Sequence, residues 1–145
     1  MRTKGFTIVE LLVVIAIIAL LAAFVSTSLI SARAKGADGA LKASFRQVFA
    51  QAEIYFNENG GFGTGLGATT DVADCTSGVF ADPQMVEIKA GILLDAAPAA
   101  TFTCSTSNGG KQWALSVSPL RGGGAWCIDN SGNYKDSTAA AGVCP

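Results

Sequence analysis

The chain has 145 residues, half of them hydrophobic and 14% charged, with a formal net charge of −1 and no histidine. This length suits one ordinary domain. Without histidine the chain lacks the usual general base and the commonest zinc ligand. The composition therefore argues against an enzyme, and we assign no catalytic residue, no cofactor and no metal ligand.

The first part of the chain is a long apolar segment. Residues 11–25 are apolar without a break, and Phe6, Ile8 and Val9 extend the segment to about 20 residues, enough for roughly 30 Å of helix. A cleaved secretory signal peptide ending at Ala32-Arg33-Ala34 is the alternative, but its apolar region would usually have only about 7–15 residues. The segment therefore predicts a membrane-spanning helix.

The charges around this segment predict its orientation. Arg2 and Lys4 lie just before it and the next basic residue is Arg33, so the positive-inside rule keeps the first residues in the cytoplasm and exports the remainder. Glu10 stands near the start of the apolar run. Because a carboxylate near hydrocarbon costs about 2.5–3.5 kcal/mol on insertion scales, Glu10 needs a partner or a purpose, which a plain anchor does not supply.

Residues 4–16, KGFTIVELLVVIA, closely resemble the class III signal of type IV pilins and pseudopilins. The resemblance implies that a prepilin peptidase cuts between Gly5 and Phe6 and methylates the new amine of Phe6. It also implies a partner for Glu10, which is the N-terminal ammonium of a neighbouring subunit in a filament. Such a pair recovers the cost of burying the carboxylate only when the subunits are in register.

After residue 25 the apolar residues recur every three or four positions, which is typical of an amphipathic helix. The stripe consists of Ile30, Ala34, Ala37, Leu41, Phe45, Val48, Phe49, Ala52, Tyr55 and Phe56. Its aromatic bulk favours packing on a sheet over a membrane-surface helix or a coiled coil. Asn59-Gly60-Gly61 should end the helix, and Asp38 and Lys42 should pair on its polar side.

We interpret residues 59–98 as a loop region with a short helix near Pro83 to Ala90. Within it, Gly63, Gly65 and Ala68 fit a loose GxGxxA pattern. A dinucleotide-binding loop follows a strand and opens a helix, whereas this segment follows a helix and leads into polar residues. A flexible surface loop is therefore the favoured interpretation.

The C-terminal part predicts an antiparallel sheet with strands near 101–105, 112–118 and 125–129. Asn108-Gly109 is a strong hairpin-turn signal between the first two strands. In a simple meander, one face of the sheet carries Phe102, Cys104, Trp113, Leu115, Val117, Trp126 and Ile128. We expect that face to meet the helix stripe.

Four cysteines, Cys75, Cys104, Cys127 and Cys144, lie in the exported part, where disulfides persist. Three pairings are possible. Cys104 and Cys127 fall on opposite faces two strands apart, which disfavours the pairing that joins them. Resemblance to the disulfide-bounded C-terminal loop of many type IV pilins favours Cys127–Cys144, and we therefore choose Cys75–Cys104 as the other bond.

The segment from Asp129 to Asp136 is polar but departs from an EF-hand loop, since its sixth residue is Tyr134 rather than glycine. A polar turn is the favoured interpretation. A calcium site using Asp129 or Asp136 stays open, because major pseudopilins bind calcium in their C-terminal loops. From Asn57 onward four basic and eight acidic residues give a charge of −4, so no nucleic-acid partner is expected.

These features together predict an α+β pilin fold, in which a long N-terminal helix packs on a small C-terminal antiparallel sheet. The expected parts are a leader at residues 1–5, a helix at 6–58 and a head at 59–145. Within the helix, residues 6–27 form the transmembrane and filament-core part. The sheet occupies 99–136, followed by a disulfide-closed C-terminal loop.

The resemblance implies a structural subunit of a type IV pilus, and a major pilin in particular. Such a subunit first spans the bacterial cytoplasmic membrane once, and the pilus assembly machinery then polymerises it with its own copies into an extracellular filament. The alternatives are a pseudopilin of a type II secretion system and a minor pilin. An exported enzyme or solute-binding domain on an anchor would need a polar constellation that the sequence does not offer.

Overall fold

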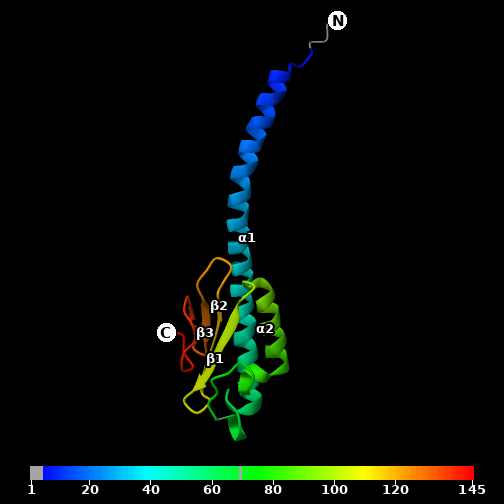
Figure 1. Ribbon diagram of the computed structural model, residues 1–145. Coiled ribbons are helices and arrows are strands. Elements are labelled where there is room, and N and C mark those ends of the chain that lie inside the picture. Colours follow the sequence, from blue (N-terminus) through cyan, green and yellow to red (C-terminus); the bar gives the residue numbers. More distant parts are fainter. Residues whose placement is uncertain (1–4, 69) are drawn as a thin grey trace. The chain divides into compact units, whose positions relative to one another are not determined.

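The computed structural model describes residues 5–68 and 70–145, apart from the side chain of Thr27, and Figure 1 shows the order of its elements. The chain divides into two compact units, Met1–Ala34 and Lys35–Pro145. Most of the expected leader, with Arg2 and Lys4, lies outside the described residues.

Helix α1 covers Ile8–Asn59. In the first unit its large apolar side chains are exposed as far as Ile30, with Leu20 at 75% and Phe24 at 79%. An 18-residue window of the helix has a mean hydropathy of 3.1 and is not buried at all, so by length and composition the helix can cross a membrane. The predicted N-terminal apolar helix is thus confirmed, and its surface requires lipid or protein to cover it.

The second unit contains a four-stranded antiparallel sheet. Its strands follow in the order β1 (Thr101–Ser107), β2 (Gln112–Ser118), β3 (Trp126–Asp129) and β4 (Tyr134–Lys135). Asn108 and Gly109 both have positive φ, 56° and 65°, at the turn between β1 and β2, as the Asn-Gly signal indicates. Strand β4 was not expected, because two residues are too few to give an alternating pattern.

The strand register confirms the predicted face of the sheet. Leu115 on β2 lies between Cys104 on β1 and Ile128 on β3. The next row of this face consists of Phe102, Val117 and Trp126. Since the side-chain period of a strand is two, these residues point to one side of the sheet and Cys127 points to the other.

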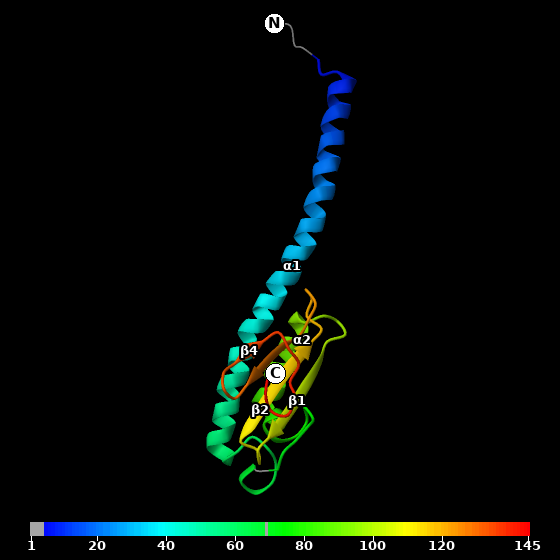
Figure 2. The ribbon, with the colours of Figure 1, turned by 90° about the vertical axis from the view of Figure 1, so that its left-hand side faces the viewer.

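Two helices cover this face, the part of α1 from residue 35 onward and α2 (Pro83–Asp95), as Figure 2 shows behind the sheet. The core that they share with the sheet includes Leu41, Phe45, Val48, Ala52, Met85, Ile92, Cys104, Trp113, Leu115, Val117 and Ile128. From Leu41 onward the helix stripe therefore meets the predicted sheet face, whereas Ile30, where the stripe was expected to begin, is 71% exposed. The predicted α+β arrangement of a long helix on a small antiparallel sheet is confirmed.

Helix α2 runs to Asp95, five residues beyond the end at Ala90 that the sequence suggested. Pro83 begins it, and the Asp82 carboxylate accepts a 3.0 Å hydrogen bond from the Met85 N–H at its first turn. Beyond Ala90 the helix continues through a glycine, which costs about 1 kcal/mol. Full burial of Ile92 outweighs that cost, because burying such a side chain contributes about 1.5–3 kcal/mol.

The prediction that Asp38 and Lys42 form an ion pair is wrong. The Asp38 carboxylate instead accepts hydrogen bonds from the backbone N–H groups of Arg121, at 2.9 Å, and Gly122, at 2.8 Å. The Lys42 Nζ lies 3.4 Å from the Asp136 carboxylate. The loop after β2 holds two amide N–H groups in place to donate to the Asp38 carboxylate. An exposed ion pair four residues apart on a helix contributes only a few tenths of a kcal/mol, so the hydrogen bonds to the loop are preferred.

Two disulfides close the second unit, Cys75–Cys104 and Cys127–Cys144, with Cα–Cα distances of 5.1 and 5.8 Å. These are the pairs chosen from the sequence. Cys104 belongs to the core beneath the helices, whereas Cys127 and Cys144 are buried together in a smaller cluster with Ala114 and Ala139. Figure 2 shows the C-terminal segment covering this outer side of the sheet.

Peptide mapping of the purified protein without reduction should recover one peptide pair joined through Cys75 and Cys104 and another joined through Cys127 and Cys144. The physical reason is that Cys104 and Cys127 lie on opposite faces of the sheet, so no short covalent bridge can join them. A peptide pair that links these two residues would contradict the register described above.

Candidate functional site

The residues at which cleavage is expected lie just before α1. Gly5, Phe6 and Thr7 have no regular secondary structure and are exposed, with Phe6 at 72%. No other atom lies within 4 Å of the position that a side chain at Gly5 would occupy. In the described part of the chain, the peptide bond between Gly5 and Phe6 is therefore open to an enzyme.

Thr7 and Glu10 form a reciprocal cap at the start of α1. Both the backbone N–H and the hydroxyl of Thr7 donate to Oε2 of Glu10, at 2.9 and 2.7 Å, and the Glu10 N–H lies 3.3 Å from the Thr7 hydroxyl oxygen. This is a capping box, in which the side chain of each residue accepts a hydrogen bond from the backbone N–H of the other. Two amide donors that the helix would leave unpaired are thereby satisfied. The Glu10 carboxylate also lies at the positive end of the helix dipole.

This role of Thr7 was not predicted from the sequence, although the TIVE stretch from Thr7 to Glu10 fits the T-x-x-E signature of a helix start. The cap gives Glu10 a partner within its own subunit. Both hydrogen bonds that Glu10 accepts from Thr7 end on Oε2. Among the described contacts Oε1 therefore stays available to a second donor.

Asp129 organises the polar turn after β3 and is only 3% exposed. Its Oδ1 accepts hydrogen bonds from the Ser131 hydroxyl and, at 3.0 Å, the Ser131 N–H, while Oδ2 accepts one from the Cys144 N–H at 3.1 Å. Burial raises the pKa of Asp129, but hydrogen bonds from Ser131, Cys144 and Asn133 outweigh it and hold the pKa below its ordinary value. The carboxylate thus joins the turn to the disulfide-closed C-terminal loop.

Asp129→Asn should lower the free energy of unfolding by about 1–3 kcal/mol at neutral pH, because an amide nitrogen cannot accept the hydrogen bond that one carboxylate oxygen now accepts. The folded pKa lies below the unfolded value of about 3.9. The contribution of the carboxylate is therefore complete above about pH 5 and is lost as the pH falls through the folded pKa. Melting of the full-length protein in detergent, followed by near-ultraviolet circular dichroism, should show the gap between wild type and variant closing from pH 7 to pH 3.

Asp136→Asn is the matched control, because the Asp136 side chain is 76% exposed and its ion pair with Lys42 should contribute less than about 1 kcal/mol. A gap between wild type and Asp129→Asn that stayed constant with pH would contradict a role for the Asp129 charge.

The other segments considered from the sequence are the acidic turn and the GxGxxA loop. Among residues 5–68 and 70–145, no group of three or more His, Cys, Asp and Glu side chains could hold a metal ion. In the GxGxxA segment, the Gly63 N–H donates to the Ala68 carbonyl at 2.8 Å, and Thr64 and Thr70 form a bridge. These amides are used within the loop, so they do not form a phosphate cradle.

Lys89 is a buried cation that was not predicted from the sequence. It lies on α2, is 8% exposed, and its ammonium donates to the carbonyls of Cys75 at 2.6 Å and Phe80 at 2.7 Å. Burial lowers the pKa of Lys89, and the charge of Asp74 partly opposes this shift. Lys89 therefore ties α2 to the segment that carries the Cys75–Cys104 disulfide.

Comparison with known proteins identifies the kind of motif that the N-terminal segment contains. Residues 1–26 match the family model described as the prokaryotic N-terminal methylation motif, and this range contains Gly5, Phe6 and Glu10. No curated protein and no solved structure matches the chain. The matched motif is the class III signal of type IV pilins and pseudopilins, which are structural proteins. With its apolar helix and its α+β fold, the chain is pilin-like or pseudopilin-like.

Proposed function

We propose that the chain is the structural subunit of an extracellular type IV pilus, and specifically its major pilin. The observation that supports this most strongly is the methylation motif at residues 1–26 on a helix whose apolar side chains are exposed up to Ile30. A surface of that extent needs a membrane first and other copies of the same helix later.

Before assembly, the subunit spans the cytoplasmic membrane once through residues 6–27. The prepilin peptidase removes residues 1–5 and methylates the new amine of Phe6. The exposure of Gly5 and Phe6 ahead of the helix cap supports this step, because a peptidase needs extended and accessible backbone.

Polymerisation exchanges contacts with lipid for contacts with neighbouring helices, so the filament core replaces the bilayer as the apolar environment. In that core the Glu10 carboxylate pairs with the methylated ammonium of Phe6 in the next subunit. Its Oε2 stays in the cap with Thr7, and its Oε1 accepts from the ammonium. This pair sets the axial register of the subunits, because an unpaired charge in the core would be costly.

The mature subunit should begin at N-methylated Phe6 and contain 140 of the 145 residues of the chain. The expectation follows from cleavage after Gly5, and intact-mass spectrometry of purified filaments with sequencing of the first peptide measures it. A subunit that begins at Met1 would contradict processing. One that begins at Lys35 would instead support a secretory signal peptide.

A pseudopilin would share this processing, so the N-terminus alone does not separate the two proposals. Imaging of cells for extracellular filaments, combined with identification of their main subunit, does. A processed chain that never appears in filaments outside the cell would favour the pseudopilin.

A further inference from the structure

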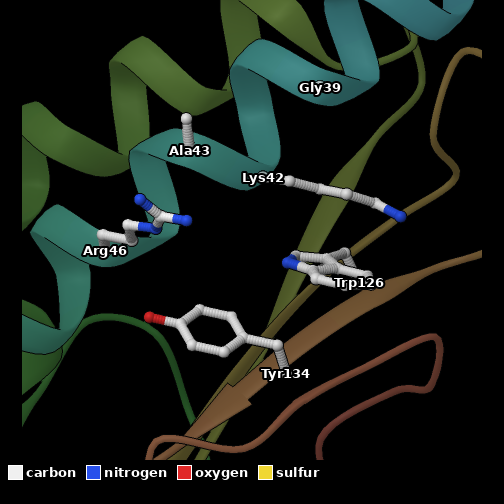
Figure 3. A pocket seen from close by; sticks show the side chains of 6 residues that line it. All are labelled: Gly39, Lys42, Ala43, Arg46, Trp126 and Tyr134. Atoms are coloured by element: carbon white, nitrogen blue, oxygen red, sulfur yellow. The ribbon is translucent and has the colours of Figure 1, made fainter.

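The second unit contains a hollow of about 270 Å³ beside the outer strands of the sheet. It is lined by Gly39, Lys42, Ala43, Arg46, Trp126 and Tyr134. Figure 3 shows the Tyr134 hydroxyl directed toward Arg46 on one side of the hollow, and Trp126 beneath the Lys42 side chain on the other. Gly39 and Ala43 on α1 have no bulky side chain to fill the hollow.

The two cations of this hollow, Lys42 and Arg46, differ in how far their charges are compensated by neighbouring groups. The Lys42 Nζ lies 3.8 Å from the centroid of the Trp126 ring and 3.4 Å from the Asp136 carboxylate, so its charge is largely compensated. Arg46 is exposed, and no ion pair or hydrogen bond of its guanidinium occurs among the described residues. The hollow therefore has one uncompensated positive charge, in a unit with seven basic and ten acidic residues.

Hydrogen-bond donors are also in excess. Trp126 and Tyr134 stack with ring centroids 6.3 Å apart, which fixes both rings at the floor of the hollow. The indole N–H of Trp126 is buried and has no acceptor in the described part of the chain. A buried donor without an acceptor costs about 1–3 kcal/mol, and an acceptor beside Arg46 recovers that loss once the side chains over the indole nitrogen shift to admit it.

We propose that this hollow binds a carboxylate. The guanidinium of Arg46 presents a planar pair of donors that matches the two oxygens of a carboxylate, and the Trp126 indole and Tyr134 hydroxyl supply further donors beside it. One uncompensated charge suits a monoanion better than a phosphate dianion. The carboxylate belongs either to an acidic side chain of a second copy of this acidic head or to a free organic acid.

The test uses the ¹⁵N-labelled full-length subunit in detergent micelles, titrated with sodium acetate that replaces sodium chloride at constant ionic strength. The chain has two tryptophans, so each indole N–H signal can be followed separately. We expect a saturable shift of the Trp126 signal, with that of the fully buried Trp113 unchanged. This part does not depend on filament formation, so its failure is distinct from failure of the proposed function.

Arg46→Gln should weaken acetate binding by about tenfold or more, as expected for loss of a charged hydrogen-bond donor. Lys35→Gln removes the same charge from the same helix outside the hollow and should leave binding unchanged, which controls for general electrostatics. Equal responses to acetate, phosphate and chloride, or unchanged binding by Arg46→Gln, would overturn the proposal.

Filaments that contain the same label then distinguish the two sources of the carboxylate, and this part rests on the proposed function. If a neighbouring subunit supplies the carboxylate, the Trp126 signal in filaments lies near its acetate-bound position before any acetate is added. If the acid is free, the signal in filaments shifts on addition of acetate as it does in micelles. Both results require the binding to Arg46 that the micelle titration establishes.

Discussion

Glu10→Gln should prevent filament assembly while leaving membrane insertion, cleavage after Gly5 and folding of the disulfide-bonded head intact. The amide has nearly the shape of the carboxylate but no charge, so the ammonium of the adjacent subunit would remain unpaired in an apolar core. Breaking such a buried pair costs roughly 3–5 kcal/mol, or more than about a hundredfold in each association equilibrium. The measurement is the ratio of sheared filament to membrane-held mature subunit.

Thr7→Ala provides the complementary control, because Glu10 has two roles, in the helix cap with Thr7 and in the proposed pair with the neighbouring ammonium. Glutamine at the third helical position still completes a capping box, so Glu10→Gln keeps the cap and loses only the charge. Thr7→Ala keeps the charge and loses the cap, at a cost of about 1 kcal/mol. We expect Thr7→Ala to assemble and Glu10→Gln to fail, and the reverse result would show that Glu10 acts through the cap.

Glu10→Leu separates pairing from affinity for the membrane. Leucine is more hydrophobic than glutamate and should favour the bilayer and the filament core equally, yet it offers no partner for the ammonium. We expect it to be as defective as the glutamine variant. Normal filament yield from both substitutions would leave the pairing hypothesis without support.

Regular patterns in the sequence predicted most of the fold. Steps of three and four residues placed Leu41, Phe45 and Val48 on one side of α1, and all three are fully buried. The alternation in the strands gave the sheet face that carries Cys104 and Leu115, because a strand has only two faces and the Asn-Gly turn fixes its partner. Such patterns depend on residues close in sequence, and one chain is enough to show them.

Contacts between a side chain and distant backbone could not be predicted in this way. Asp38 binds amides more than eighty residues later in the chain, and Asp129 binds the Cys144 N–H. Neither partner is marked by its residue type, since every residue except proline offers an N–H. The capping box at Thr7 is different, because its signature is local and was present in the sequence.

Lys89 is intermediate between the contacts with distant backbone, which could not be predicted, and the local signature of the capping box. It falls on the same side of α2 as Met85 and Ile92, at spacings of four and three residues, and both of those neighbours are fully buried. Extending the predicted helix beyond Ala90 would have placed a lysine within an apolar stripe and raised the question of its partners. A buried ammonium needs acceptors, and the carbonyls of Cys75 and Phe80 provide them.

Lys89→Met should lower the melting temperature of the head by about 5–10 °C, corresponding to a loss of about 2 kcal/mol in a unit of this size. Methionine can fill the space of the lysine stem, but it leaves the carbonyls of Cys75 and Phe80 without their donor. The measurement is near-ultraviolet circular dichroism of the full-length protein in detergent, since both tryptophans lie in the second unit. Lys111→Met, at an exposed position, should change the melting temperature little. Equal melting of the Lys89 variant and wild type would mean that relief of the buried charge offsets the lost hydrogen bonds, and that Lys89 does not hold α2 to the disulfide segment.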